Sequence, residues 1–324
     1  MRSLHICSLV MALVLSTPAL AALLPPQFIS SVVAIGIPQQ VIEQGKPPRT
    51  EWIALGTGFF FGKLVADDPD ITKRKYEIYL VTAKHVIHEH VIAGRVVQIR
   101  INPKDTSTKF EQFDIPSRAT PYQYSWFYHP DDKIDLAAVQ VNFNTLLERG
   151  FDASFFHDDQ HTAATKKLVD IGVSAGDGVF VLGFPMQMTG NERHYVIVRQ
   201  GIIARIAELL EARSSTFLLD SFVFPGNSGG PVILKPEITA ITGTKSNNSS
   251  LLIGLVLSYR SYNDIAYSKQ TQRPRVVFEE NSGLSEVLPV DKINDAIEAW
   301  QKVRVPLFPT LPNPAIPLLI PTPR

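Results

Sequence analysis

Phe224-Pro225-Gly226-Asn227-Ser228-Gly229-Gly230-Pro231 is the stretch around which the other segments of this 324-residue chain can be interpreted. Glycines stand two positions before Ser228 and one and two positions after it. They allow a tight turn, because some of its backbone angles are closed to residues with a Cβ atom. Backbone N–H groups then converge beside the hydroxyl, as an acyl-transfer nucleophile requires. An ordinary glycine-rich turn is the alternative interpretation, and only other segments can decide between the two.

The composition is typical of a globular protein, and the first residues have the pattern of an export signal. Hydrophobic residues make up 45% of the chain, enough for a sizeable core in one large or two modest domains. The 31 basic and 31 acidic residues cancel, so neither a nucleic acid nor an anionic membrane surface is indicated as a partner. Residues 1–21 have the pattern of a signal peptide: Arg2, an apolar run at 9–15, and the cleavage site Ala19-Leu20-Ala21.

The one cysteine, Cys7, lies inside this signal, so a mature chain beginning at Ala22 has neither a thiol nor a disulfide. Cys7 precedes the apolar run, which argues against a lipid-anchored cysteine. Export without disulfides is typical of a bacterial periplasmic or secreted protein. No later apolar stretch is long enough to span a bilayer.

Short strand-like segments separated by turn residues recur through most of the chain. They are 28–37, 52–64, 76–82, 96–101, 110–115, 136–141, 179–183, 195–199, 217–220, 232–234 and 251–257. Residues 144–170 are less regular and are expected to hold a helical turn or two. Residues 202–213 favour a helix by propensity, but their place between two strands favours a hairpin, which we expect. Many short strands, few helices and no internal repeat predict an all-β barrel or double barrel.

The C-terminal part of the chain predicts a helix and then a tail. A helix over 291–302, with Asp291 as candidate N-cap, is expected to pack against the barrel body. Its apolar face is formed by Ile293, Ala296, Ile297 and Trp300. Seven of the 21 residues from 304 to 324 are proline and none is acidic, which predicts an extended, polyproline-like tail. We expect this tail to be unnecessary for the active site.

A serine nucleophile needs a base within hydrogen-bond reach and a third group that orients the base. His85 follows one hydrophobic strand and Asp135 begins another. The order His, Asp, Ser, with gaps of 50 and 93 residues, is one of the known orders of this triad. Each residue alone is more often structural, but the three together favour catalysis. Asp131 and Asp132 compete with Asp135, although they lie in a turn where solvated acids are common.

The chain resembles the trypsin-like serine peptidases, nearest to their bacterial HtrA-type branch. The matching segments are Gly56-Thr57-Gly58-Phe59, Val81-Thr82-Ala83-Lys84-His85-Val86, Asp135-Leu136-Ala137, Gly183-Phe184-Pro185, Gly201-Ile202-Ile203 and Gly226-Asn227-Ser228-Gly229-Gly230-Pro231.

This resemblance implies two six-stranded antiparallel β-barrels with the site in the cleft between them. The peptidase unit would span 22–303, with the first barrel at about 28–143, the second at about 171–288 and the helix at about 289–302. His85 and Asp135 would come from the first barrel and Ser228 from the second. The backbone N–H groups of Gly226 and Ser228 would form the oxyanion hole.

The chain also departs from the family it resembles. No PDZ-like segment is expected after the peptidase unit, since only a helix and a proline-rich tail follow Pro289. Animal enzymes carry an aspartate before the nucleophile that pairs with a newly cleaved N-terminus, but here the residue is Asn227, so that ion pair is not expected. His88, Glu89 and His90 lack a matching cluster elsewhere, and we expect neither a metal nor a cofactor.

The resemblance also places the substrate pocket, with Phe222 at its floor and Leu257, Ser258 and Tyr259 along one wall. A pocket for Lys or Arg would need a carboxylate, because burying an unpaired cation costs several kcal/mol. Phe222 offers none, and together with Tyr259 it shortens the pocket. We therefore expect cleavage after small or medium aliphatic residues, driven by apolar burial of roughly 1–3 kcal/mol.

The sequence thus predicts a periplasmic or extracellular serine endopeptidase whose partner is its polypeptide substrate. The main alternative is a catalytically silent module on the same fold that binds peptides by strand addition. An esterase of the α/β-hydrolase type is disfavoured, because the chain order Ser, Asp, His is absent. Nothing in the sequence indicates the oligomeric state.

Overall fold

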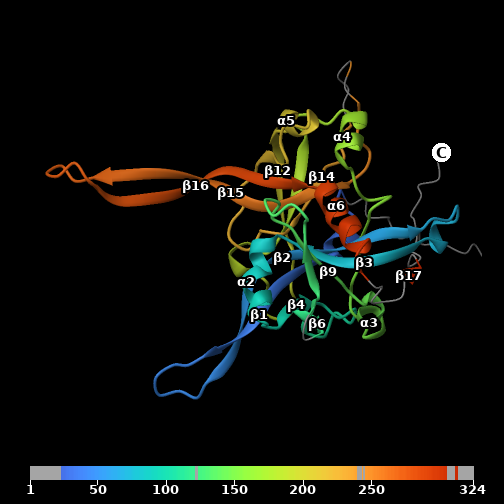
Figure 1. Cartoon of the computed structure of the whole chain (residues 1–324), viewed down its shortest axis with the longest axis horizontal. Helices are drawn as coiled ribbons and strands as arrows, with labels where there is room; N and C mark the ends of the chain where they lie inside the picture. Colours follow the sequence, from blue (N-terminus) through green and yellow to red (C-terminus); the bar gives the residue numbers. More distant parts are fainter. Residues whose placement is uncertain (1–22, 121–122, 239–242, 244, 305–310, 313–324) are drawn as a thin grey trace, which may run out of the picture.

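The computed structural model describes residues 23–120, 123–238, 243, 245–304 and 311–312. The predicted signal peptide at 1–21 lies outside these residues. Strands dominate and fall into two groups, an open sheet from the first half of the chain and a closed barrel from the second (Figure 1). The expected all-β class with two groups of strands and a C-terminal helix is confirmed; the second group closes into a barrel, and the first is an open sheet. No helix among the described residues has the length and apolar content needed to cross a membrane.

The first sheet has the strand order β5-β4-β1-β2-β3-β9-β8, with all of these neighbours antiparallel. Its path strands are β1 (Val32–Val41), β2 (Arg49–Ala66), β3 (Lys75–Thr82), β4 (Val97–Ile101), β5 (Glu111–Ile115), β8 (Trp126–Tyr128) and β9 (Ala137–Gln140). Two short strands join it from elsewhere: β10 (Phe156–His157) pairs with β2 in parallel, and β17 (Leu311–Pro312) pairs with β3. A separate ribbon consists of β6 (Arg118–Thr120) and β7 (Gln123–Tyr124).

This sheet does not close among the described strands. Its path ends at β5 and β8, and a mostly apolar cavity of about 470 Å³ borders that opening. Phe113 and Ile115 of β5 and Val139 of β9 contribute to its wall. The implied first barrel is therefore an open sheet enlarged by β10 and β17, which attach from distant parts of the chain.

The second group is a closed antiparallel barrel of six strands in the order β11-β12-β13-β16-β15-β14. Its members are β11 (Gly178–Gly183), β12 (Ile197–Arg205), β13 (Phe217–Asp220), β14 (Pro231–Leu234), β15 (Leu251–Tyr267) and β16 (Pro274–Pro289). The hairpin expected around 202–213 is confirmed, since β12 pairs with β13 and a one-turn helix, α5 (Ala207–Leu210), lies in the connection. β15 and β16 extend far beyond the barrel as a two-stranded ribbon (Figure 1). This ribbon was not predicted, since the strand expected at 251–257 ends ten residues before β15 does.

The other helical segments are short except for α2 and α6. They are α1 (Pro26–Ser30), α2 (Lys84–Ile92), α3 (Phe143–Glu148), α4 (Thr165–Ile171), α6 (Val290–Gln301) and the 3₁₀ turns η1 (Ile71–Lys73) and η2 (Pro185–Gln187). The prediction of a strand from residue 28 was wrong at its start. Pro26 occupies the first helical position, where its fixed φ suits a helix, and β1 begins only at Val32.

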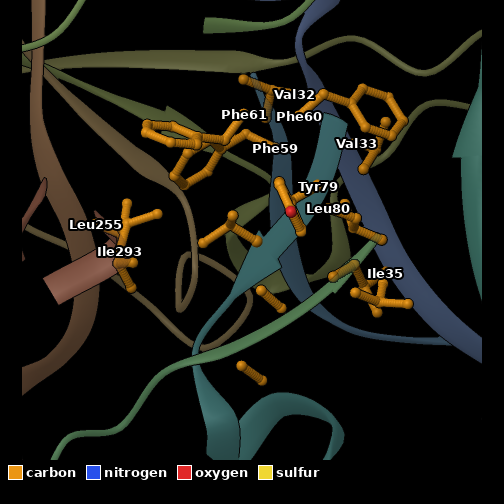
Figure 2. Close-up of a cluster of buried hydrophobic side chains, with 14 of the residues drawn as sticks. Val32, Val33, Ile35, Phe59, Phe60, Phe61, Tyr79, Leu80, Leu255 and Ile293 are labelled. Atoms are coloured by element: carbon orange, nitrogen blue, oxygen red, sulfur yellow. The ribbon is translucent and has the colours of Figure 1, made fainter. Parts of the chain in front are cut away.

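One hydrophobic core joins the two groups of strands. Phe59, Phe60 and Phe61 of β2 are fully buried, and the same cluster extends to Leu255 of the barrel and Ile293 of α6 (Figure 2). A second cluster lies among the barrel strands. Because the larger cluster crosses the boundary, the open sheet and the barrel pack as one body.

Helix α6 packs against β15, β16 and β8. The predicted apolar face is confirmed: Ile293, Ala296 and Ile297 are buried, and Trp300 stacks on Phe127 with ring centroids 4.5 Å apart. The predicted N-cap was wrong, because the cap position is occupied by Pro289. Asp291 instead accepts hydrogen bonds from the backbone N and the hydroxyl of Thr165, both at 2.9 Å, at the start of α4.

The predicted tail boundary at residue 304 also needs correction. The Arg304 side chain is 7% exposed and forms a buried ion pair with Glu77 of β3. It also donates to Gln140 of β9 at 3.1 Å and lies over the Trp300 ring. Arg304 therefore belongs to the folded body. Of the remaining tail only Leu311–Pro312 is described, and it forms β17, so a purely polyproline-like tail is wrong there.

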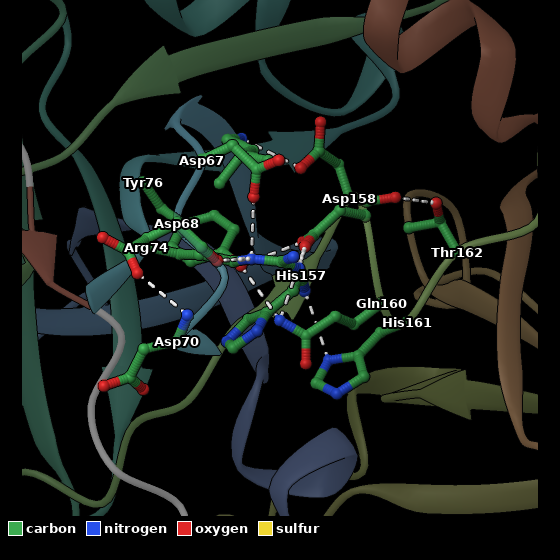
Figure 3. A network of polar contacts seen from close by, with 12 residues as sticks. Asp67, Asp68, Asp70, Arg74, Tyr76, His157, Asp158, Gln160, His161 and Thr162 are labelled. Carbon is green, nitrogen blue, oxygen red and sulfur yellow. Dashed lines mark hydrogen bonds and ion pairs between the residues drawn. The ribbon is translucent and has the colours of Figure 1, made fainter. Parts of the chain in front are cut away.

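A partly buried polar network joins the segment that follows β10 to the first sheet (Figure 3). Tyr76 donates to Asp159 at 2.9 Å, and Asp159 also pairs with Arg74. The His157 ring lies against His161, with ring centroids 4.6 Å apart. Burial lowers the pKa of His157 to about 3 and that of His161 to about 4, so both imidazoles are neutral at neutral pH.

Candidate active site

The pairing of β3 with β9 brings His85 and Asp135 together. Thr82, at the end of β3, lies opposite Ala137, at the start of β9. His85 follows Thr82 by three residues, in the first turn of α2, and Asp135 precedes Ala137 by two. Nδ1 of His85 lies 2.5 Å from Oδ2 of Asp135, and the His85 backbone N–H donates to Oδ1 at 2.9 Å. The carboxylate thus holds both the ring and the backbone of the histidine.

The surroundings of the Asp135 carboxyl lower its pKa and so favour the ionised form. Its burial by itself raises the pKa, but hydrogen bonds from the His85 ring and from the backbone N–H groups of His85 and Lys84 outweigh burial, and the net pKa is lowered. The two competing acids are placed differently. Asp131 accepts from the backbone N–H of Lys133, and the nearly fully exposed Asp132 lies near Lys84.

Ser228 lies on the turn before β14, and its hydroxyl donates to the backbone oxygen of Leu257 at 2.9 Å. That oxygen is available because Leu257 is the extra residue of a β-bulge: Val256 pairs with Val287 and Ser258 with Glu286. Within the described part of the chain the hydroxyl makes no hydrogen bond to His85. The nucleophile candidate is therefore bound to β15.

The N–H groups of Gly226 and Ser228, which are predicted to form the oxyanion hole, belong to peptide groups whose carbonyls are those of Pro225 and Asn227. Both carbonyls accept hydrogen bonds. Pro225 O accepts from Met186 N at 2.7 Å, and Asn227 O accepts from Gly230 N at 2.8 Å. In a trans peptide the N–H points away from the carbonyl, so the Gly226 and Ser228 N–H groups are fixed in direction. Neither donates a hydrogen bond within the described residues. Met186 adopts φ 52°, a rare conformation for a residue with a side chain.

Thr57 of β2 joins the open sheet to the Ser228 turn, a role that was not predicted from the sequence. Its N–H donates to Ser228 O at 2.9 Å and its hydroxyl donates to Gly226 O at 2.6 Å. The hydroxyl also accepts from Phe184 N at 3.1 Å. The side chain is fully buried. The only sequence signal was the presence of Thr57 in one of the matching segments.

This junction explains two of the glycines. Gly229 has φ +82°, and a Cβ there would lie 2.2 Å from both Thr57 O and the Thr82 hydroxyl. Gly226 has φ +102°, and its Cβ would lie 2.3 Å from Phe184 O. Side chains are excluded both by the backbone angle and by the space, so the turn requires glycine at these positions.

Asn227 braces the same turn. Its backbone N–H donates to Phe224 O at 2.9 Å, and its side-chain oxygen accepts from Phe224 N at 3.0 Å. The side chain is almost completely buried. A neutral amide therefore closes the turn at the position where the animal enzymes carry an aspartate.

The residues predicted for the substrate pocket lie at the edge of the barrel. Phe222 follows β13 and is half exposed, with its ring near Gly283. Leu257, Ser258 and Tyr259 follow one another on β15, and Tyr259 packs partly against the barrel core. Phe222 thus does not form a closed floor in this structure, and its role in specificity stays a prediction.

The histidines considered for metal binding point to different partners. The His88 ring meets Tyr128 edge-on, and Nδ1 of His90 lies 3.2 Å from Arg95. In the described residues, His, Cys, Asp and Glu side chains do not gather in groups of three that could hold a metal ion.

Comparisons with known proteins identify the family of the chain. Residues 56–237 match the family model of the trypsin-like peptidase domain. Among solved structures, human heparin binding protein aligns with a TM-score of 0.45 and 12% identity, over 87% of this chain and 96% of that chain. A search of curated proteins found no match.

Proposed function

Because the chain belongs to the family of trypsin-like peptidase domains, we propose that it is a serine endopeptidase acting through an acyl-enzyme. The observation that carries the proposal is the contact of His85 with Asp135, 2.5 Å between ring nitrogen and carboxylate. It is the base-and-orienter pair that a serine nucleophile needs. Ser228, on its glycine-bounded turn beside β2, is the proposed nucleophile.

In the proposed reaction the Ser228 oxygen attacks the carbonyl carbon of the scissile bond, and its proton passes to Nε2 of His85. Asp135, ionised because hydrogen bonding lowers its pKa, stabilises the resulting imidazolium. The backbone N–H groups of Gly226 and Ser228 bind the oxyanion. His85 then gives its proton to the leaving amine. Water repeats the sequence on the ester and releases the acid.

One observation favours the alternative, a catalytically silent peptide-binding module. The Ser228 hydroxyl donates to Leu257 and not to His85. The proposed enzyme requires this side chain to rotate about its Cα–Cβ bond, a motion that side chains at partly exposed sites make within nanoseconds. The bond to Leu257 is a single neutral hydrogen bond, with a net value of about 1 kcal/mol, so it does not lock the rotamer.

A fluorophosphonate probe tests the proposal directly, because it reacts only with an activated serine. Wild-type protein should be labelled at Ser228, and Ser228→Ala should not be labelled. His85→Ala should slow both labelling and casein hydrolysis by about 10⁴ or more while the protein stays folded. Labelling that survived Ser228→Ala would make the nucleophile assignment wrong. Peptide binding by an unlabelled wild type would establish the silent module.

We also propose the substrate class predicted from Phe222 and Tyr259: polypeptides cut after small or medium aliphatic residues. The absence of an acidic side chain among the predicted pocket residues supports this specificity. Product sequencing from an unbiased peptide library measures it. Dominant cleavage after Arg, Lys, Asp or Glu would overturn it.

The proposed location is the periplasm or the exterior of the cell, on the basis of the signal pattern in residues 1–21. N-terminal sequencing of protein recovered outside the cytoplasm should begin at Ala22. Protein that retains Met1 and remains in the cytoplasm would contradict the proposal.

A further inference from the structure

The ribbon formed by the outer parts of β15 and β16 stands apart from the rest of the molecule (Figure 1). We call residues 261–281 the arm; its strands pair from Ser261 opposite Asn281 to Tyr267 opposite Pro274. At its root, Ser282 to Leu284 form a bulge opposite Arg260, which directs the arm away from the barrel. The arm is thus an extension of two barrel strands beyond the part of the sheet that they share with β13 and β14.

The arm exposes an unusual amount of apolar surface. Its six large apolar side chains are between 39% and 60% exposed. They are Tyr262, Ile265, Tyr267, Val276, Val277 and Phe278. Strand alternation places them on both faces of the ribbon. An isolated two-stranded ribbon is only marginally stable in water. Exposed apolar side chains in such number indicate a surface that binds a partner.

The outer edge of β16 is also unpaired. β13 covers only Leu284–Val287, so residues 274–281 have β15 on one side and, among the described residues, no strand on the other. A free edge presents a row of backbone donors and acceptors that can accept another strand. Pro274, which has no N–H, limits one end of this edge, and the bulge at 282–284 limits the other.

The sequence of this edge is complementary to itself when read in the opposite direction. In Arg275-Val276-Val277-Phe278-Glu279, an antiparallel copy centred on Val277 places each Arg275 opposite a Glu279. Each Val276 then faces a Phe278. Directly opposite charges stabilise a strand pair, and aromatic and β-branched side chains form favourable cross-strand pairs. Neither Arg275 nor Glu279 has an ion-pair partner within the described part of this chain, and both are exposed.

We propose that the arm is a dimerisation surface for a second copy of this chain. The two β16 edges pair antiparallel about a twofold axis at Val277 and form a continuous four-stranded sheet. The arm projects from the body (Figure 1). Antiparallel pairing would therefore place the two bodies at opposite ends of this sheet. The contact is isologous, so it closes after two copies. Arg275 is the extra residue of a bulge opposite Tyr267, where the regular ladder of β15 and β16 ends. The pair of Arg275 with Glu279 of the second copy is therefore the last pair of the proposed interface.

Sedimentation velocity of the mature chain over a range of concentrations tests this dimer. All samples carry Ser228→Ala, which prevents self-digestion and keeps the result independent of the proposed activity. The parent protein should dimerise. Arg275→Glu or Glu279→Arg should each raise the dimer Kd by at least about tenfold, because each creates two like-charge contacts per dimer. Lys269→Glu, at the tip outside the paired segment, should leave the Kd unchanged.

Charge exchange distinguishes this interface from any other. The double variant Arg275→Glu/Glu279→Arg should dimerise like the parent protein, and an equimolar mixture of the two single variants should form heterodimers. A parent protein that is monomeric at every concentration would overturn the proposal, even if the arm bound a substrate peptide or the C-terminal tail. A dimer insensitive to the single changes, or a double variant that stayed dissociated, would also overturn it.

Discussion

The open sheet and the closed barrel differ in how their strands are paired and covered. The barrel is formed by one continuous stretch of chain, from β11 to β16. Inside the barrel every strand has a paired strand on both sides. The sheet ends at β5 and β8 and depends on groups that arrive from later in the sequence, including β10, α6 and Arg304. The half that carries His85 and Asp135 is therefore the half whose stability depends on contacts distant in sequence.

The largest expected effect concerns catalysis in the open sheet. Asp135→Asn should lower kcat by about 10⁴, because the amide cannot hold the imidazole in the required tautomer or stabilise its charge. Asp132→Asn is the matched control: it removes a neighbouring acid that is almost fully exposed, and it should change kcat little. Steady-state hydrolysis of a peptide substrate measures both. The reverse ranking would move the third member of the triad to Asp132.

Arg304 provides the sharpest test of dependence on distant contacts. Arg304→Met leaves the Glu77 carboxylate buried without its cation, and breaking such a pair costs about 3–5 kcal/mol of unfolding free energy. Urea denaturation measures the loss. The double variant Arg304→Met/Glu77→Gln should recover most of it, because no uncompensated charge remains.

Truncations compare the same contact with the rest of the tail. A chain ending after Lys302 lacks Arg304 and should be strongly destabilised, whereas a chain ending after Arg304 keeps the ion pair. Equal stability of the two truncated chains would show that the ion pair does not secure the sheet.

Acid should weaken the contacts around the open sheet before it affects the barrel core. Burial lowers the pKa of His157 to about 3 and those of His161 and His194 to about 4. The unfolded chain then binds protons that the folded chain does not, so stability is lost as the pH falls from about 6.5 towards 4. Each histidine contributes up to roughly 1.4 kcal/mol per pH unit.

Unfolding free energies between pH 7 and 4 test this slope. His157 has no hydrogen bond to its ring nitrogens within the described residues, and it packs against Tyr76 and Phe155. His157→Phe should therefore reduce the slope of unfolding free energy against pH in this range by the amount that corresponds to about one bound proton. An unchanged slope would mean that His157 titrates alike in both states.

The smallest expected effect concerns the junction between the two halves. Thr57→Val removes the hydroxyl that bridges Gly226 O and Phe184 N, and it leaves both buried groups without that partner. We expect a loss of about 1–3 kcal/mol in stability. We also expect a roughly tenfold fall in kcat, because the turn that carries the proposed oxyanion hole loses a support. Thr57→Ser keeps the hydroxyl and should retain both. Identical kcat values for the two variants would show that Thr57 does not position the turn.

Much of the fold was predictable because its signals are local. The apolar face of α6 follows from residues three and four apart, and it was confirmed. The arm was missed, since Tyr262-Asn263-Asp264-Ile265-Ala266-Tyr267 does not alternate cleanly between apolar and polar residues. Such alternation arises when one face of a strand is buried, and the arm has no buried face within the described residues.

The resemblance to a serine peptidase could be predicted from the amino-acid order, because the glycines around Ser228 and the order of His85, Asp135 and Ser228 are local patterns and spacings. The sequence favoured Asp135 over Asp131 and Asp132, but the contact of Asp135 with His85 depends on the register of β3 against β9, which arises only in the folded chain. Tertiary structure also decided that Thr57 supports the Ser228 turn and that Arg304 neutralises Glu77. These contacts join residues more than 160 positions apart, and the hydrophobic packing of the two halves brings them together.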